Sequence, residues 1–453
     1  MAGFEEFLAV ISGVVWGPPL LILIVGTGIY LTVRLGFLQV RLLPYALKLV
    51  FSKNVDKESK GDISHFQALS TAMAATVGTG NIVGVATAVV LGGPGAVFWM
   101  WISAFFGMAT KYGEAVLAVK YRVTDAKGQM AGGPMYYLEH GLKQKWLAVL
   151  FAIFGAVAAF GIGNGTQSNS VASIVDDTFG VAPWITGIVL TIFAAAVILG
   201  GIKTIGKVTA FFVPIMVLFY VIAGLVVMVL NFDLIPAALG TIFSAAFTGE
   251  AAVGGAIGAA IRYGVARGVF SNEAGLGSAP IAAAAARTDM PGRQALVSMT
   301  QVLFDTLIVC SITGITIVMS GLHLSTDLEG APLTSAAFGQ FLGGAGPYIV
   351  AIGLIFFASS TIIGWSYYGE KCFQYLFKSP SLLIVYRIVF VGVVFVGATV
   401  SLDVVWSFSD VMNGLMAIPN LIGLLGLSGV IIYETKKIVA KVKEEKEAER
   451  AGN

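Results

Sequence analysis

Eleven long apolar stretches follow one another along the chain, and they constrain its fold more than any other feature. They cover approximately residues 9–33, 64–90, 95–119, 147–175, 181–200, 208–231, 250–286, 294–320, 346–370, 382–401 and 410–433. A helix that crosses a bilayer needs about 20 mostly apolar residues. Stretches of this length are typical of helices, which satisfy their own backbone hydrogen bonds in lipid. The sequence therefore predicts an all-α, polytopic membrane protein.

The overall composition excludes several other classes of protein. Of the 453 residues, 57% are apolar and 11% are charged, whereas a soluble globular chain has about 25% charged residues. A soluble enzyme, a nucleic-acid-binding protein and a disordered protein are therefore excluded. We expect the lipid bilayer as the main partner, with no nucleic acid and no obligate protein partner. The two cysteines, Cys310 and Cys372, lie in apolar stretches and have no disulfide or metal-binding pattern.

Basic residues are concentrated in alternate connections between these stretches. The connections after the odd-numbered stretches, with the charged tail, account for 25 of the 27 Lys and Arg residues. Because basic residues favour the cytoplasmic side, this pattern predicts an N-terminus outside and a C-terminus in the cytoplasm, with the chain in the plasma membrane. Only Arg262 and Arg267 depart from it, and reading 250–286 as one broken crossing preserves the alternation. The sequence thus favours eleven spans.

Two polar interruptions fall inside apolar stretches. The first is Ala-Ala-Thr-Val-Gly-Thr-Gly-Asn at 74–81, and the second runs from Arg267 to Ser278. Unwinding there would expose carbonyl groups to a cation and amide groups to an anion. We expect Arg267 and Glu273 to pair across the second break, since charges at membrane depth are costly. The alternatives are a glycine seam for helix packing in the first case and a structural re-entrant loop in the second.

The positions of the two breaks predict an inverted repeat. If the first stretch is an extra helix, the others form two sets of five, and each break falls in the first helix of its set. Five is an odd number, so the second set is inverted relative to the first. The expected organisation is an extra helix and basic loop (1–61), two five-helix repeats (62–231 and 232–433) and a charged cytoplasmic tail (434–453).

Further polar residues lie within the spans. Asn164 and Gln167 are three residues apart, so they are expected on one helix face, where they either join helices or line a polar cavity. Hydroxyl groups cluster at 359–361, where bonding to their own helix is the alternative. Glu114 and Asp305 are acids within spans that either relay protons or serve a structural role.

Three segments resemble those of a known transporter family. The segment Gly-Gly-Pro-Gly-Ala-Val-Phe-Trp-Met-Trp-Ile-Ser-Ala-Phe-Phe-Gly at 92–107 is similar to the signature of the alanine or glycine:cation symporter (sodium/alanine symporter) family. The segments 77–82 and 271–278 resemble that family as well. The family belongs to the amino acid–polyamine–organocation superfamily. The resemblance implies a leucine-transporter-type fold of five plus five helices, in which core helices 1 and 6, here 64–90 and 250–286, are broken.

The same resemblance implies a sodium site between core helices 1 and 8. The carbonyl groups would be those of Ala74 and Val77, and the hydroxyl groups those of Ser359 and Ser360, or Thr361 after a shift of one residue. Core helix 5, at 208–231, contains no Lys or Arg whose charge could replace the cation. Sodium is therefore the expected coupling ion, and no other cofactor is expected.

A zwitterionic amino acid needs partners for both of its charges. Half-helix amides carry the positive end of a dipole, so the carboxylate is expected at the unwound first break, with a side-chain donor from the fourth stretch. The ammonium group is expected at carbonyl groups of the second break, with bulky walls limiting substrate size. The expected substrate-binding residues are Gly78, Thr79, Gly80, Asn81, Asn164, Gln167, Phe270, Ser271, Asn272 and Trp365.

The expected function is import of a small neutral amino acid, alanine and also glycine, coupled to a sodium gradient by alternating access. The alternative is a proton-coupled transporter that uses Glu114 or Asp305. An ion channel would need repeated pore helices with a filter sequence, and a membrane-embedded enzyme would need a catalytic dyad or metal cluster. The sequence contains neither pattern, so both classes are disfavoured.

Overall fold

The computed structural model describes residues 2–52, 56, 58–248, 257–400 and 402–451. The described residues are almost entirely helical, as predicted. The only two strands among them, β1 (Val123–Thr124) and β2 (Met130–Ala131), form a short antiparallel hairpin. Seven described helices are long and apolar enough to cross a membrane, and three shorter helices are apolar. The prediction of a multi-pass membrane protein is confirmed, and the count of eleven crossings stays a prediction.

The N-terminal segment is divided more finely than the sequence predicted. The helices are α1 (Ala2–Val15), α2 (Pro18–Arg34), α3 (Leu38–Arg41) and α4 (Leu43–Val50). The first apolar stretch is thus interrupted between Val15 and Pro18. Gly17 is extended, and the prolines that follow it occupy the first helical positions, where a missing N–H costs nothing.

The first repeat contains the first predicted break. Its elements are α5 (His65–Thr76), η1 (Thr79–Asn81), α6 (Val83–Gly92), α7 (Gly95–Lys120), α8 (Pro134–Tyr136), η2 (Tyr137–Gly141), α9 (Lys145–Phe160), η3 (Gly161–Gly165), α10 (Thr166–Phe179), α11 (Pro183–Ile198) and α12 (Gly201–Leu230). A capping box of Ser64 and Gln67 starts α5. The helix ends at Thr76 because Val77 is extended and Gly78 is far from helical geometry. The second apolar stretch, 64–90, is therefore broken rather than a continuous packing seam.

The second repeat and the tail contain the second break. Their elements are η4 (Phe232–Leu234), α13 (Ile235–Thr248), α14 (Ile257–Asn272), α15 (Pro280–Ala283), α16 (Pro291–Val302), η5 (Leu303–Cys310), α17 (Ser311–Ser320), α18 (Leu322–Ser325), α19 (Gly330–Leu342), α20 (Ala345–Leu376), α21 (Pro380–Thr399), α22 (Leu402–Gly426) and α23 (Ser428–Ala451). Residues 250–256, the start of the seventh predicted stretch, lie outside the described residues. Glu273, Gly275 and Gly277 have positive φ values of 58°, 95° and 82°. A right-handed helix cannot continue through such residues.

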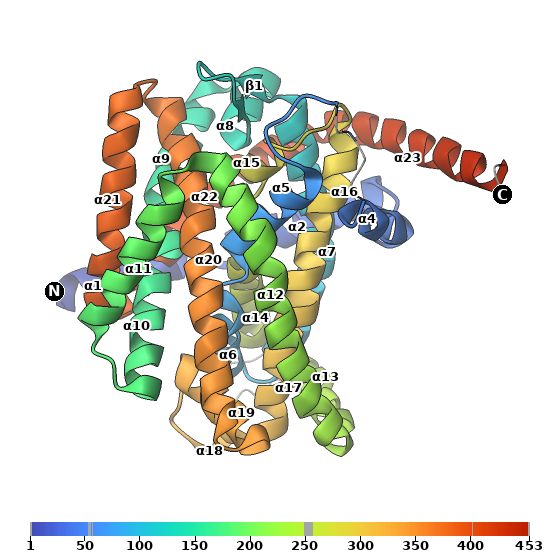
Figure 1. Cartoon of the computed structure of the whole chain (residues 1–453). Coiled ribbons are helices and arrows are strands. Elements are labelled where there is room, and N and C mark those ends of the chain that lie inside the picture. The colour runs from blue at the N-terminus through green and yellow to red at the C-terminus, as the bar shows by residue number, and fades with distance from the viewer. Residues whose placement is uncertain (1, 53–55, 57, 249–256, 401, 452–453) are drawn as a thin grey trace.

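The connections lie at two opposite ends of the bundle. Figure 1 shows β1 and α8 at one end and α18 and α19 at the other, with α13 and α17 near the latter. The connections predicted to be cytoplasmic and outside are thus separated, as the alternation of charge requires. The helices α13, α18 and α19 were not predicted, because they are short and lie in connections between the apolar stretches.

The outer surface of the bundle is apolar in the middle of its helices. On α12, Phe211, Leu218 and Val229 are each more than half exposed, as expected for side chains that face lipid. The interior is closely packed, and Gly163 shows how closely. A Cβ atom at Gly163 would lie 2.1 Å from Cβ of Trp365, so only glycine lets α20 approach η3 there.

Candidate substrate and cation site

The carbonyl and hydroxyl groups expected to bind sodium lie together. Ser360 Oγ donates to the carbonyl of Ala74 at 3.2 Å, and Thr361 Oγ1 donates to the carbonyl of Val77 at 3.3 Å. Both hydroxyl groups also donate to the carbonyl of Phe357 in their own helix, which was the alternative interpretation of this cluster. Ser359 is buried but makes no hydrogen bond to α5 within the described chain. Among the alternatives, the geometry favours the hydroxyl groups of Ser360 and Thr361.

Gln167 reaches the first break from α10. The backbone N–H of Thr79 donates to Gln167 Oε1 at 3.1 Å, and Gln167 Nε2 donates to the carbonyl of Ile162 at 2.8 Å. The N–H of Gly78 donates to Asn81 Oδ1 at 2.9 Å. The amide groups expected to bind a carboxylate are thus held by side-chain oxygens, which an anionic ligand would have to replace.

Gly78 lies between the expected cation position and the expected substrate position. A Cβ atom at Gly78 would lie 2.5 Å from Thr361 Oγ1 and 3.0 Å from Gln167 Oε1. A hydroxyl group of the expected cation site and a side chain of the expected substrate site therefore border the same residue. The single unwound segment of 77–81 contributes backbone groups to both.

The second break packs directly on the first. A Cβ atom at Gly80 would lie 3.1 Å from Cα of Ser271 and 3.4 Å from the ring of Phe270. Asn272 lies beside them and donates to Thr306 Oγ1 at 3.0 Å. The structure thus brings together the two breaks and Gln167.

The structure does not bring Asn164 to the breaks. Its amide donates to the carbonyl of Phe390 on α21 at 2.7 Å, whereas Gln167 contacts Thr79. The expectation that Asn164 and Gln167 share one helix face is therefore wrong. Asn164 belongs to the wider π-helical turn of η3, Gly161–Gly165, and Gln167 to the α-helix that follows it, so the three-residue phase of an α-helix does not relate the two side chains.

Arg267 does not pair with Glu273, contrary to the sequence prediction. Arg267 forms a two-pronged ion pair with Asp410 of α22, at 3.0 and 3.1 Å. Glu273 lies beyond the end of α14 with a positive φ, and its carboxylate accepts from Trp365 Nε1 at 2.7 Å and from Ser278 Oγ at 2.5 Å. The turn at the break therefore directs the acid toward α20, away from Arg267.

An aromatic stack lies beside the second break. The rings of Phe270 and Trp406 stack with centroids 5.2 Å apart, and the guanidinium group of Arg267 lies within 6 Å of both. Trp406 was not predicted. Only its position as an aromatic residue near the start of the last span could have indicated it.

Asp305 joins the two breaks. Its fully buried carboxylate accepts from Asn81 Nδ2 at 2.8 Å, from Ser271 Oγ at 2.9 Å and from Thr306 Oγ1 at 2.6 Å. The sequence marked this acid only as a charge within a span. A sequence signal for its role at the breaks was its position in the span that follows the second break.

Glu114 supports the second break from α7. One carboxylate oxygen accepts from the backbone N–H groups of Gly275 and Gly277, at 3.0 and 3.1 Å, and from Asn420 Nδ2 at 2.7 Å. Lys111 Nζ lies 3.8 Å from its other oxygen. These contacts fix the loop between α14 and α15 against the neighbouring helices.

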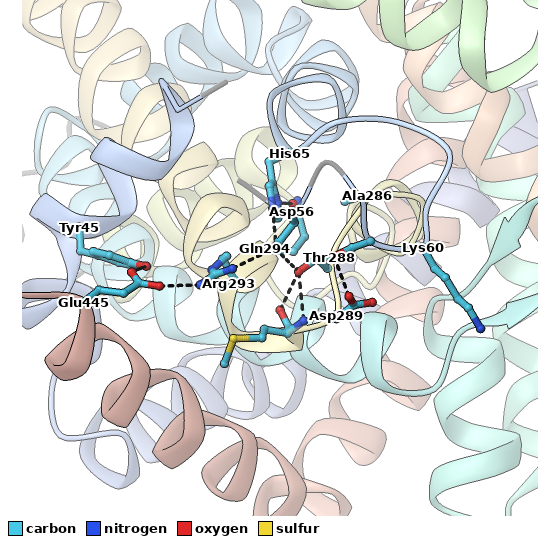
Figure 2. Close-up of polar contacts among 12 residues, drawn as sticks. Tyr45, Asp56, Lys60, His65, Ala286, Thr288, Asp289, Arg293, Gln294 and Glu445 are labelled. Atoms are coloured by element: carbon cyan, nitrogen blue, oxygen red, sulfur yellow. Dashed lines mark hydrogen bonds and ion pairs between the residues drawn. The ribbon is translucent and has the colours of Figure 1, made fainter. Parts of the chain in front are cut away.

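A polar cluster around Arg293 lies outside the site and joins distant segments (Figure 2). Arg293 pairs with Asp56 at 2.5 Å and with Glu445 of α23 at 2.7 Å. His65, the first residue of α5, and Thr288 also contact Asp56. Burial alone would raise the pKa of Asp56, but the bonds with His65 and Thr288 and the charge of Arg293 lower it to about 2. We call this set the Arg293 cluster.

The fold and the site define a class of protein. Broken helices in matching positions of two helical repeats, packed on each other at mid-bundle, are typical of secondary transporters. A solved structure of MhsT in complex with L-phenylalanine matches with a TM-score of 0.58 at 13% identity, over 83% of this chain and 98% of that one. The fold is therefore of the leucine-transporter type, as expected.

The chain belongs to the sodium:alanine symporter family, whose model matches residues 1–451. The sodium/alanine symporter AgcS of Methanococcus maripaludis is 62% identical over 440 residues, which cover 96% of this chain and 97% of the relative. The amino-acid carrier protein AlsT of Bacillus subtilis is 37% identical, over 98% of this chain and 93% of the relative. The family resemblance is confirmed. The protein is a multi-pass membrane symporter and not an enzyme.

Proposed function

We propose that the protein imports alanine, and glycine as a smaller substrate, together with sodium by alternating access. One observation carries the proposal. The unwound segment of 77–81 borders Thr361 on one side and Gln167 on the other. A cation and an amino acid bound there would order the same backbone, so each would favour the binding of the other.

The substrate would bind with its carboxylate at the amide groups of Thr79, Gly80 and Asn81, in place of side-chain oxygens such as Gln167 Oε1. Its ammonium group would bind carbonyl groups near Phe270 and Ser271. A closed apolar wall of Phe270 and Trp406, with Trp365, would limit the side chain to a methyl group. Such a wall discriminates by only about 1–3 kcal/mol per methylene, so small amino acids would compete.

Sodium would bind the carbonyl groups of Ala74 and Val77 and the hydroxyl groups of Ser360 and Thr361. Hard oxygen ligands suit this ion, and the described chain holds no cluster of three His, Cys, Asp or Glu residues suited to another metal. The relative AgcS is named a sodium/alanine symporter, which supports sodium as the coupling ion.

The test compares two hydroxyl deletions on α20 in proteoliposomes with labelled alanine. Thr361→Ala removes an expected sodium ligand. Ser366→Ala removes a buried hydroxyl whose only hydrogen bond among the described residues is to the carbonyl of Ile363 in its own helix. We expect Thr361→Ala to raise the sodium concentration for half-maximal uptake at least about tenfold, the loss of one charge-assisted contact. Equal sodium dependence in the two variants would refute the proposed cation site.

Proton coupling is the second candidate, and Asp305 is the observation that favours it. A buried carboxylate that touches both breaks could carry a proton between the two sides. Under the sodium proposal, a pH gradient alone drives no uptake. Uptake driven by a pH gradient without sodium, and lost in Asp305→Asn, would establish the proton mechanism instead.

A further inference from the structure

A basic groove lies between the end of α2, α3 and the C-terminal helix α23, away from the transport site. The groove has a volume of about 360 Å³. Its basic side chains are those of Arg34, Arg41, Lys436 and Lys443, and its floor includes Leu35 and Val439. No acidic side chain of the described chain lines it.

The four basic groups are only weakly compensated. Arg41 donates to the carbonyl of Gly36 at 3.1 Å, and Arg34 lies 5.8 Å from the centre of the Tyr30 ring. Lys443 lies 3.9 Å from Glu447, where both side chains are exposed. Within the described chain, Lys436 has no hydrogen-bond or ion-pair partner. Four cations around one groove repel each other, so an anion that binds all of them would be stabilised.

The position of the groove selects the kind of anion. Arg34 is the last residue of α2, which the sequence predicts to end at the cytoplasmic face, and α23 extends sideways from the bundle (Figure 1). In the segment 33–41, which carries Arg34 and Arg41, the apolar side chains of Val33, Phe37 and Val40 are 60%, 49% and 56% exposed. A segment that combines exposed apolar and basic side chains suits contact with both the acyl chains and the headgroup of a lipid, and basic pockets on the cytoplasmic side favour anionic headgroups.

The opposite side of α23 is fixed to the bundle, so the groove is a formed feature. Glu445 accepts from Arg293 at 2.7 Å and from Tyr45 at 2.6 Å (Figure 2). Glu434, nearer the start of the helix, accepts from Lys120 at 2.9 Å. Glu434 and Glu445 thus face the protein, while Lys436 and Lys443 line the groove.

We propose that this groove binds the phosphate headgroup of an anionic phospholipid. The headgroup would join α2 and α3 to α23 and would therefore stabilise the docked tail. The site is independent of the transported substrate and of the coupling ion.

The experiment measures thermal unfolding of the purified full-length protein while lipid is added. The probes are phosphatidylglycerol, phosphatidylcholine and inorganic phosphate. The groove variant is Arg34→Gln, Arg41→Gln, Lys436→Gln and Lys443→Gln. The control variant has the same net charge but changes exposed basic residues outside the groove, namely Lys127→Gln, Lys143→Gln, Lys203→Gln and Lys207→Gln.

We expect phosphatidylglycerol to stabilise the wild type and the control variant at similar concentrations. The groove variant should require at least about tenfold more, because each basic residue near a membrane surface adds to the attraction for anionic lipid. Equal responses of the groove and control variants would overturn the proposal. Equal stabilisation by phosphatidylcholine, or by inorganic phosphate, would overturn the assignment to an anionic lipid. If the fourfold variant does not fold, Lys436→Gln with Lys443→Gln should show a smaller shift in the same direction, and no shift would overturn the site.

Discussion

At the scale of single residues, Gly78 is the position where the two proposed ligands meet. A methyl group there would overlap Thr361 Oγ1 and press on Gln167 Oε1. We expect Gly78→Ala to weaken both sodium and alanine binding by about tenfold or more, since overpacking costs about 1–3 kcal/mol. Binding isotherms of the purified protein measure both effects. Gly84→Ala in α6 is the matched control, because its added Cβ atom would meet nothing within 4 Å. Gly78→Ala with normal binding of both ligands would contradict the account.

Phe270 tests the proposed limit on substrate size. Its ring is buried and stacks on Trp406, beside the point where the two breaks touch. We expect Phe270→Ala to bind larger amino acids such as leucine more tightly relative to alanine, by about 1–3 kcal/mol per methylene accommodated. Competition against labelled alanine measures the change. Phe211→Ala, which alters an exposed ring on α12, should leave the selectivity as it is, and an equal change in both variants would place the wall elsewhere.

The variant Gln167→Ala tests whether the alanine site can be weakened without affecting the sodium site. The side chain contacts the amide of Thr79 but makes no contact with Ser360 or Thr361 among its described hydrogen bonds. Once the substrate carboxylate replaces Gln167 Oε1 at the Thr79 amide, the side-chain N–H groups of Gln167 would donate to that carboxylate. We therefore expect alanine binding to weaken by about 1–2 kcal/mol, while sodium binding measured without alanine changes little. Calorimetry on the purified variant gives both values. A variant that loses sodium binding and keeps alanine binding would reverse our assignment.

Local backbone geometry followed from the sequence where a short motif determined it. The glycines and Asn81 of the first break predicted unwound backbone, and the structure has it. The partners of Asp305, Arg267 and Trp406 could not be predicted, because each lies far away in the chain. Asn164 was misplaced because a π-helical turn leaves no mark in the spacing of polar residues.

At the scale of helices, the Arg293 cluster holds α5, α16 and α23 together. The pKa of Asp56 is lowered from 3.8 to about 2, so the carboxylate stabilises the folded state above about pH 4. That contribution is lost as the pH falls through 2. We expect Asp56→Asn to lower stability by about 2 kcal/mol at neutral pH, with a difference from wild type that persists down to about pH 4.

The measurement is the midpoint of thermal unfolding across that pH range. Asp289→Asn is the control, since Asp289 is exposed and bonds only to Ser59 among the described residues. A difference between Asp56→Asn and wild type that vanished between pH 7 and pH 5 would show that Asp56 ionises at a higher pH than the cluster implies.

Helices and breaks differed in how well the sequence predicted them. Long apolar stretches predicted the major helices. Glycines with Asn81 indicated the first break, and glycines with the charged residues Arg267 and Glu273 indicated the second. The division of α1 from α2 was overlooked because the apolar run continues through Gly17 and the two prolines. The helices α13, α18 and α19 are short and pack at the end of the bundle, so no membrane-length pattern marks them.

At the scale of the whole molecule, the orientation in the membrane is a prediction from charge. Lys127 follows β1, and Thr326 follows α18, at opposite ends of the bundle in Figure 1. We expect a membrane-impermeant thiol reagent to label cysteine at Thr326 from outside intact cells. Cysteine at Lys127 should be labelled only after the membrane is opened. Both native cysteines are buried, so the wild type gives the background, and the reverse pattern would invert the topology.

The central claim is that sodium and an amino acid share one unwound segment, so that neither moves without the other. The most direct measurement follows labelled sodium and labelled alanine together in the same proteoliposomes. The account predicts that alanine accumulates against its gradient only when sodium enters, and that outward alanine gradients drive sodium out. Alanine accumulation without sodium movement, under a pH gradient or none, would contradict it.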